Sequence, residues 1–198
     1  MTTPEPKLDP NVAPLDVCGW RRLSSVTTYD NPWISVHHHE VLTPSGSKGI
    51  YGLVHFKGHA VGVVPIDADD HTYLVRQSRY TLDRYTWEIP EGGAHAGESP
   101  MDCARRELQE ECGVSAARIT PLLELHTSNS VTDERASVFV ARELTVGKIN
   151  LDPTEDIEVR RLPLEEAIAM ALSGEITDAI SVAALFKLAL LRRTGVEI

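Results

Sequence analysis

Residues 91–114 have the sequence EGGAHAGESPMDCARRELQEECGV, which carries the start and stop signals of a helix. Ser99 and Pro100 match the N-cap and the first position of a helix, and Gly113 is typical of a helix end. The segment therefore predicts a helix over residues 100–112. At about 100° per residue, its apolar side chains fall within an arc of roughly 80°. They form the buried stripe of the helix, which consists of Met101, Ala104, Leu108 and Cys112.

Three carboxylates lie close together on this predicted helix. Glu107, Glu110 and Glu111 occupy an arc of about 100° at the edge of the buried stripe, and carboxylates spaced at i, i+3 and i+4 repel one another. A solvated acidic face is the simpler interpretation, but such a face would lie opposite the stripe rather than beside it. A hard divalent cation reverses the sign of the repulsion, and Mg²⁺ and Mn²⁺ prefer carboxylate oxygens. The pattern therefore predicts a metal site.

The spacing around this helix also carries a resemblance. Gly92, five residues, Glu98, seven residues and then RELQEECGV from Arg106 to Val114 resemble the complete Nudix box, with every fixed position occupied. The resemblance implies an α+β chain with a Nudix α/β/α sandwich, in which a mixed sheet lies between helices. It also implies metal-dependent hydrolysis of a nucleoside diphosphate that is linked to another group.

The resemblance assigns roles to the residues of the box. Glu107 and Glu111 would be the main ligands of Mg²⁺, for which Mn²⁺ can substitute, and Glu110 would support them. Glu91 would contribute its backbone carbonyl. The remaining fixed positions would have a structural role, with the glutamate and the arginine paired to hold the loop onto the helix; they are Gly92, Glu98, Arg106 and Gly113.

The segments outside the box narrow the resemblance. VRQSRYTLDRYTWEIPEGG is similar to the stretch that precedes the box in ADP-ribose pyrophosphatases and nucleoside-diphosphate-sugar hydrolases, and the likeness extends over residues 28–193. Arg79 is a candidate phosphate clamp because a guanidinium can bind two phosphate oxygens at once, and Arg84 is a second candidate. Glu88 matches a position near the substrate. The alternatives are surface arginines and a solvated glutamate at a strand end.

Two aromatic residues of the N-terminal region have a role by the same resemblance. Trp33 and Tyr51 match positions at which relatives stack the adenine, with one ring from each subunit of a homodimer that exchanges its N-terminal strands. An exposed tryptophan at the start of a strand suits base stacking. Core packing is the alternative for Tyr51.

The general base has two candidates. Glu134 lies in TSNSVTDER and Glu155 in LDPTEDIEV, and in this family a glutamate on a loop after the box often activates water or binds another metal ion. The sequence departs from the pattern at Pro153, which stands where some relatives have glutamate. The loop before Glu134 lacks the proline of ADP-ribose-specific members, which favours a broader substrate preference or another nucleotide sugar.

Periodicity predicts the remaining elements. WISVHHHEVLTPSGSKGIYGLVHF alternates as a β-hairpin does, so its three consecutive histidines cannot share one face. Further strands are expected at 59–67, 72–80, 119–127, 135–144 and 157–163, and helices at 164–173 and 178–193. We divide the chain into a flexible tail (1–16), an N-terminal β region for dimerisation and base binding (17–56) and a Nudix hydrolase domain (57–198).

Composition restricts the class of protein. The net charge is −10 and the isoelectric point is near 5.2, which argues against a nucleic-acid partner because that would need a basic stripe. The longest apolar run falls short of the roughly 20 residues that span a membrane, and the N-terminus does not have the pattern of a signal peptide. We therefore expect a cytoplasmic protein with reduced thiols at Cys18, Cys103 and Cys112.

These observations lead to three hypotheses. The first is a homodimeric, Mg²⁺-dependent Nudix pyrophosphatase that hydrolyses the pyrophosphate bond of ADP-ribose or a related nucleoside diphosphate sugar, giving a nucleoside monophosphate and a sugar phosphate. The second is a Nudix-fold metabolite sensor that binds such ligands without turnover, although its usual mark would be a degenerate box. The third, a nucleoside-triphosphate or RNA-end pyrophosphohydrolase, is disfavoured by the acidic charge and by the resemblance outside the box.

Overall fold

The computed structural model describes residues 15–148 and 156–196. The chain forms two compact units. The first comprises the chain up to Lys57 together with Ser128–Glu134, and the second comprises Gly58–Thr127 and the chain from Arg135 onward. Among the described residues, every helix is too short or too polar to span a membrane.

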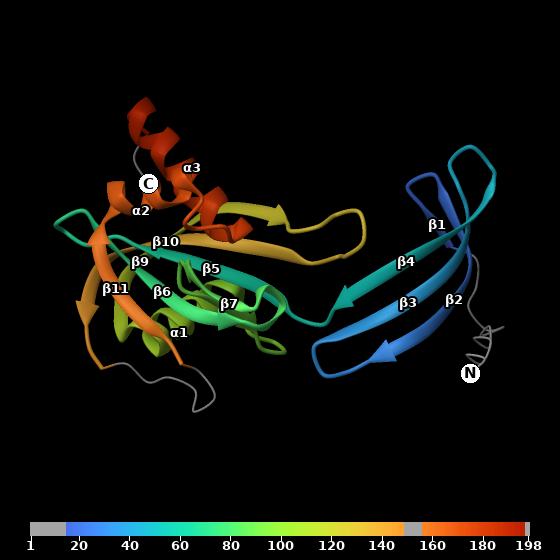
Figure 1. The fold of residues 1–198 in the computed structure, drawn as a ribbon, viewed down its shortest axis with the longest axis horizontal. Coiled ribbons are helices and arrows are strands. Elements are labelled where there is room, and N and C mark those ends of the chain that lie inside the picture. The colour runs from blue at the N-terminus through green and yellow to red at the C-terminus, as the bar shows by residue number, and fades with distance from the viewer. Residues whose placement is uncertain (1–14, 149–155, 197–198) are drawn as a thin grey trace. The chain divides into compact units, whose positions relative to one another are not determined.

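The first unit contains an antiparallel sheet whose four strands follow one another in chain order (Figure 1). The predicted hairpin is confirmed, with Ile34 paired to Phe56 at its open end. Leu15 and Asp16, which we assigned to the tail, lie in the first strand. The strands are β1 (Leu15–Val17), β2 (Trp20–Asp30), β3 (Ile34–Leu42) and β4 (Lys48–Phe56).

The second unit is built on a mixed sheet in the order β8-β5-β10-β9, in which β5 and β10 are parallel and the other pairs antiparallel. Its strands are β5 (His59–Pro65), β8 (Glu91–Ala94), β9 (Val114–His126) and β10 (Arg135–Val146). An antiparallel sheet in the order β11-β6-β7 accompanies it. It consists of β6 (His71–Arg79), β7 (Arg84–Glu88) and β11 (Glu158–Pro163), with the short 3₁₀ helix η1 (Tyr80–Leu82) between β6 and β7.

Three α-helices complete this unit: α1 (Pro100–Cys112), α2 (Leu164–Ser173) and α3 (Ala179–Thr194). Each agrees with its predicted range to within one residue. The expected caps of α1 are present: the Asp102 N–H donates to Ser99 Oγ at 3.1 Å, and Gly113 takes the left-handed conformation with a φ of 65°. The helix ends therefore agree with the signals that the sequence carries locally.

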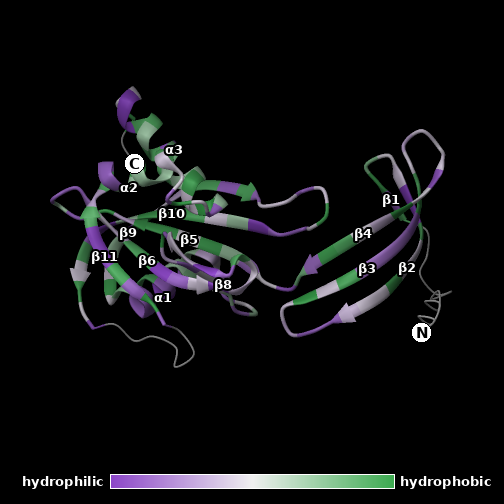
Figure 2. Ribbon diagram, in the orientation of Figure 1, coloured by the Kyte–Doolittle hydropathy of each residue, from purple (hydrophilic) through white to green (hydrophobic). Residues whose placement is uncertain are grey.

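Successive side chains of β5 point to opposite faces of the sheet and pack in two different hydrophobic clusters. Val61 and Val63 pack in one cluster with the buried residues of α1. Val64, one residue further on, packs in the other cluster with α2 and α3. Hydrophobic residues accordingly run along β5 and β10 (Figure 2). The sheet is thus covered by helices on both sides, as the expected α/β/α sandwich requires.

The beginning of α3 is attached to the chain that follows β7. Asp178 caps the helix by accepting a 2.7 Å hydrogen bond from Ser181 N–H. The Ser181 hydroxyl accepts a 3.0 Å hydrogen bond from the N–H of Ile89, which lies between β7 and β8. A Cβ added to Gly62 on β5 would approach Ile180 and Ile89 to 2.9 Å. The end of β7, the middle of β5 and the start of α3 are therefore in close contact.

Candidate active site

Two glutamates of α1 turn inward toward the glycines that precede the helix. Glu107 and Glu111 are only 8% and 2% exposed. A Cβ at Gly92 would lie 2.1 Å from Glu107 Oε1, so only glycine leaves room for this carboxylate. Glu111 Oε2 accepts a 3.0 Å hydrogen bond from Glu91 N–H. The spacing of the glutamates and the absence of a side chain at Gly92 together place both carboxylates against the start of β8.

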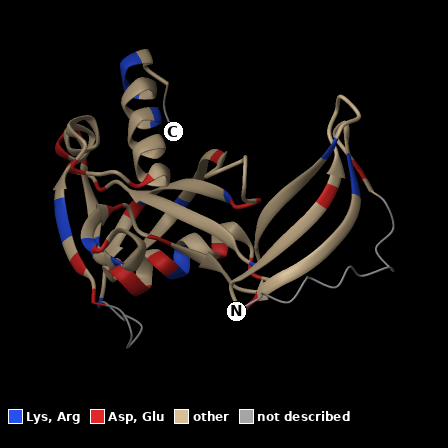
Figure 3. Cartoon of the chain, turned by 45° about the vertical axis from the view of Figure 1, so that its right-hand side comes forward, with Lys and Arg blue, Asp and Glu red and all other residues tan. Residues whose placement is uncertain are grey.

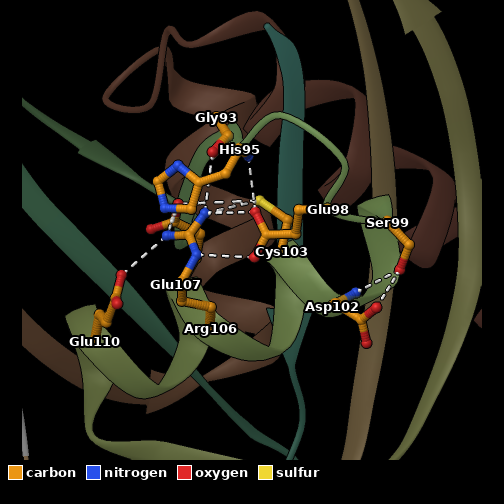
Figure 4. A network of polar contacts seen from close by, with 9 residues as sticks. All are labelled: Gly93, His95, Glu98, Ser99, Asp102, Cys103, Arg106, Glu107 and Glu110. Carbon is orange, nitrogen blue, oxygen red and sulfur yellow. Dashed lines mark hydrogen bonds and ion pairs between the residues drawn. The ribbon is translucent and has the colours of Figure 1, made fainter.

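Arg106 connects the same loop to the helix (Figure 4). Its Nε and Nη2 each donate to the Glu98 carboxylate at 3.0 Å, and Nη2 also donates to the Gly93 carbonyl at 3.0 Å. Its Nη1 donates to Glu107 at 2.7 Å and to Glu110 at 2.9 Å. The arginine therefore holds the loop and also balances two of the helix carboxylates.

The ion pair of Glu98 predicts a pH dependence of stability. Hydrogen bonds from Arg106, which outweigh burial, lower the pKa of Glu98 from 4.5 to about 2. A carboxyl with a depressed pKa stabilises the fold above its unfolded pKa, and this contribution is lost as the pH falls through the folded pKa. The free energy of unfolding of the native chain should therefore exceed that of Glu98→Gln at neutral pH, and the difference should shrink between pH 4.5 and about 2.

Urea unfolding of both proteins across this pH range measures the difference. Glu158→Gln is the control for loss of one glutamate, because the Glu158 side chain is 61% exposed. A gap between the native chain and Glu98→Gln that stays constant down to about pH 2 would contradict the role of the ion pair.

A second ion-paired group consists of Arg79 at the end of β6, Glu88 at the end of β7 and Glu91 at the start of β8. The Arg79 Nε donates to both oxygens of Glu88, at 2.9 and 3.1 Å, and its Nη2 donates to Glu88 and, at 2.7 Å, to Glu91. Glu88 is 2% exposed and also accepts a hydrogen bond from the Thr86 hydroxyl. The hydrogen bonds that Arg79 itself donates to Glu88 raise the pKa of Arg79, so the guanidinium stays charged.

Negative charge at Glu91 is only partly compensated. Burial, followed by repulsion from Asp178 and Glu88, raises the pKa of the Glu91 carboxyl well above its ordinary value, although Arg79 opposes the shift. The Glu91 Oε2 atom is buried without a hydrogen-bond partner. Lys and Arg positions are scattered over several elements of the described chain (Figure 3). The cation that is paired with Glu91 is Arg79.

These observations test whether a divalent cation fits. The two ion-paired groups offer carboxylate oxygens, Glu88 and Glu91 in one and Glu107 and Glu111 in the other, which are the donors that Mg²⁺ prefers. Glu91 Oε2 is buried without a hydrogen-bond partner. Donor type and charge therefore fit the cation. Within residues 15–148 and 156–196, however, no three His, Cys, Asp or Glu side chains already have the spacing of a metal site. The helix carboxylate Glu107 is ion-paired with Arg106 instead.

The other predicted site residues lie in several places. Arg84 is the cross-strand partner of Arg79, and its Nη2 donates to Thr177 Oγ1 at 3.0 Å. In the first unit, Trp33 is 74% exposed, and Tyr51 packs edge-on against Trp20 with ring centroids 5.5 Å apart. Glu134 directly precedes β10. Glu155 and Pro153 lie outside the described residues.

Two contributors to the site were not expected from the sequence. The Glu91 side chain joins the ion-paired group, whereas the resemblance implied only its backbone carbonyl. Asp178 acts on both Glu91 and Arg79. The sequence around Asp178 carries the signal of a helix N-cap, but nothing local indicates that this cap lies near residues that precede it by 87 and 99 positions.

Comparisons with known proteins agree with this geometry. The NUDIX domain matches residues 57–185, and the nucleoside diphosphate sugar hydrolase N-terminal domain matches residues 20–54. The chain is 36% identical over 148 residues to the ADP-ribose pyrophosphatase of Bacillus subtilis, covering 74% of this chain and 80% of that protein. It is 33% identical over 164 residues to the ADP-ribose pyrophosphatase of Mycobacterium tuberculosis, covering 81% of this chain and 79% of that protein.

A solved structure gives the same result for the fold. The crystal structure of an ADP compounds hydrolase superposes with a TM-score of 0.78 at 26% sequence identity, covering 89% of this chain and 96% of that one. The NUDIX match spans more than half of the sequence and includes the complete box, the ion-paired loop and the buried carboxylates. The chain therefore belongs to the Nudix hydrolase family.

Proposed function

We propose that this chain hydrolyses the pyrophosphate bond of ADP-ribose or a related nucleoside diphosphate sugar in a reaction that depends on Mg²⁺ or Mn²⁺. The observation that carries the proposal is that Glu107 and Glu111 of α1 lie against the start of β8, where Glu91 and the buried Glu88 are ion-paired with Arg79. Buried carboxylates that outnumber their cationic partners favour the uptake of a cation. The two relatives described as ADP-ribose pyrophosphatases support this substrate class.

Glu107 and Glu111 would hold the cation, with support from Glu110 and from Glu91. The chemistry that a bound divalent cation supplies at such a site is neutralisation of the diphosphate charge and a lower pKa for water. The hydrogen bond from Glu91 N–H to Glu111 connects the start of β8 to the helix that carries these carboxylates.

Arg79 is suited to bind the diphosphate. Its bonds to Glu88 and Glu91 use Nε and Nη2, so Nη1 takes part in none of them, and 37% of the side chain is exposed. One edge of the guanidinium is therefore anchored while the other can contact phosphate oxygens. Arg84 lies directly opposite on the neighbouring strand. Like charges in this position repel, and an anionic ligand would relieve that repulsion.

In the reaction, a water oxygen forms a bond to one phosphorus while the bond from that phosphorus to the bridging oxygen breaks. The bridging oxygen leaves with the other phosphate, and a base takes the proton of the water. Glu134 and Glu155 are the candidates for this base, and Glu134 is the one that the structure describes. We further propose that Trp33 and Tyr51 stack the base, that the N-terminal region mediates homodimerisation, and that the protein acts in the cytoplasm.

The test is product detection with ADP-ribose, ADP-glucose, GDP-mannose, UDP-glucose and ATP, each with Mg²⁺, with Mn²⁺ and with EDTA. We expect cleavage of a sugar diphosphate to a nucleoside monophosphate and a sugar phosphate, with loss of activity in EDTA. Binding of ADP-ribose without product would favour a sensor, and faster cleavage of ATP would favour a triphosphate hydrolase. Either result would overturn the proposed reaction.

A further inference from the structure

The first turn of α3 presents a buried hydroxyl to the segment that joins β7 to β8. Ser181 is completely buried, and its Oγ accepts a 3.0 Å hydrogen bond from the N–H of Ile89, which is also completely buried. The helix cap sets the position of Ser181, because the Ser181 N–H donates to the Asp178 carboxylate at 2.7 Å. Serine is mostly exposed in folded proteins. Here a buried serine instead serves a backbone N–H outside its own helix.

The segment of residues 89–91 is bonded at three successive positions. The Pro90 carbonyl accepts a 2.9 Å hydrogen bond from Val63 N–H of β5, and the Glu91 N–H donates to Glu111 of α1 at 3.0 Å. Proline has no N–H, so both N–H groups of the segment have a partner. The three partners come from α3, β5 and α1. The path of the backbone through this segment therefore depends on α3 as well as on the two elements nearer in sequence.

This segment is also the junction between two sheets. β7 ends at Glu88 and β8 begins at Glu91, and the two strands belong to different sheets. Only Ile89 and Pro90 lie between them. The 2.7 Å ion pair between Arg79 of β6 and Glu91 therefore crosses the junction. The position of the Glu91 carboxylate relative to the other sheet depends on the path of these two residues.

Apolar packing surrounds the hydrogen bond from Ile89. Ile180, the neighbour of Ser181, belongs to the same hydrophobic cluster as Ile89. A Cβ added at Gly62 would lie 2.9 Å from both isoleucine side chains, so the two meet directly over this glycine. Because close-packed interiors transmit small displacements, a change at Ser181 should reach the backbone of the junction.

We propose that Ser181 is a positioning residue that fixes the junction between β7 and β8 and thereby keeps Glu91 in the geometry that the cation requires. This inference rests on the proposed function. Ser181 touches no reacting atom and acts through the Ile89 N–H. The role makes the first turn of α3, which lies far beyond the Nudix box in sequence, a support of the metal-binding carboxylates.

The experiment removes the acceptor in the full chain. Ser181→Ala leaves the Ile89 N–H buried without its partner. We expect kcat to fall about tenfold and the dissociation constant of Mn²⁺, followed by paramagnetic resonance, to rise about tenfold, as is typical when a bond that supports a metal ligand is lost. KM should change less than about twofold, because Arg79 keeps its bonds to Glu88 on the neighbouring strand.

Hydrogen exchange of the metal-free protein tests the junction directly. In Ser181→Ala, the Ile89 amide should exchange about tenfold faster relative to the amides of the β5–β10 ladder. Ala184→Gly is the matched control, since Ala184 is also completely buried in α3 and glycine destabilises a helix without removing the hydroxyl. This control should show no selective change at Ile89. Ser181→Cys, whose sulfur is a weak acceptor, should show the same effects at smaller size if the alanine variant does not fold.

The outcomes separate the inference from the proposed function. Equal losses of kcat in Ser181→Ala and Ala184→Gly at similar temperatures of unfolding would overturn the positioning role in favour of a general effect on stability. Unchanged Mn²⁺ affinity in Ser181→Ala, despite faster exchange at Ile89, would also overturn it and leave the hydrolase assignment intact. An unmodified chain that cleaves no sugar diphosphate would refute the proposed function, whereas the comparison of Mn²⁺ affinities would still decide the role of Ser181.

Discussion

Replacement of Glu111 by Gln should lower turnover of the preferred nucleotide sugar by about a thousandfold, equivalent to about 4 kcal/mol of transition-state stabilisation. The carboxylate is 2% exposed and accepts a hydrogen bond from Glu91 N–H. Glutamine has nearly the same shape and keeps one acceptor oxygen for that bond. Loss of a charge from a crowded group of carboxylates should leave folding intact while it weakens binding of the cation.

Turnover and Mn²⁺ binding, the latter followed by paramagnetic resonance, measure the two effects separately. Glu166→Gln on α2 is the matched control, because this glutamate is also helical but is exposed and paired with Arg160. Near-normal turnover in Glu111→Gln would show that the assignment of the metal ligand is wrong. Loss of turnover with unchanged Mn²⁺ affinity would assign Glu111 a role other than holding the ion.

Gly92→Ala should reduce turnover by about a hundredfold, because displacement of a catalytic group by about 1 Å can cost that much. The added Cβ would lie 2.1 Å from Glu107 Oε1 and 2.3 Å from its carboxyl carbon. The glutamate side chain can rotate away, so we expect a modest change in the temperature of unfolding. The carboxylate itself, however, would leave its position beside β8.

Gly93→Ala is the control at the adjacent residue. A Cβ there meets nothing within 4 Å, and its carbonyl remains available to Arg106. We expect Gly93→Ala to keep near-normal turnover. Equal losses in the two variants would mean that flexibility of the glycine pair, rather than space for Glu107, is what the site requires.

The parts of the fold with local signals could be predicted from the sequence. The helix over residues 100–112 has its own cap residues, and the β3–β4 hairpin has alternation on both sides of a turn. By contrast, β8 has the sequence EGGA, which contains no residue that favours strands. It becomes a strand because Glu91 pairs with Gly62 on β5, and such pairing depends on the rest of the fold.

The same distinction applies to the site. Helical spacing brings Glu107 and Glu111 together, so their proximity could be predicted. The ion pair between Arg79 and Glu88 depends on the register of β6 and β7, in which Val75 rather than Arg79 is the direct partner of Glu88. The hydrogen bond from Ile89 to Ser181 depends on where α3 packs. Sequence alone therefore indicates candidate residues for the chemistry but not the neighbours that hold them.

The bond between Ile89 N–H and Ser181 Oγ has a practical consequence for recombinant fragments. It connects residues that are 92 positions apart, and the first of them lies two residues before Glu91. A shortened protein that stopped after α2 would keep the whole Nudix box but lose the hydrogen bond to Ile89 N–H, just before the box. The boundary of a minimal catalytic fragment should therefore be drawn after α3, well beyond the last residue of the sequence motif.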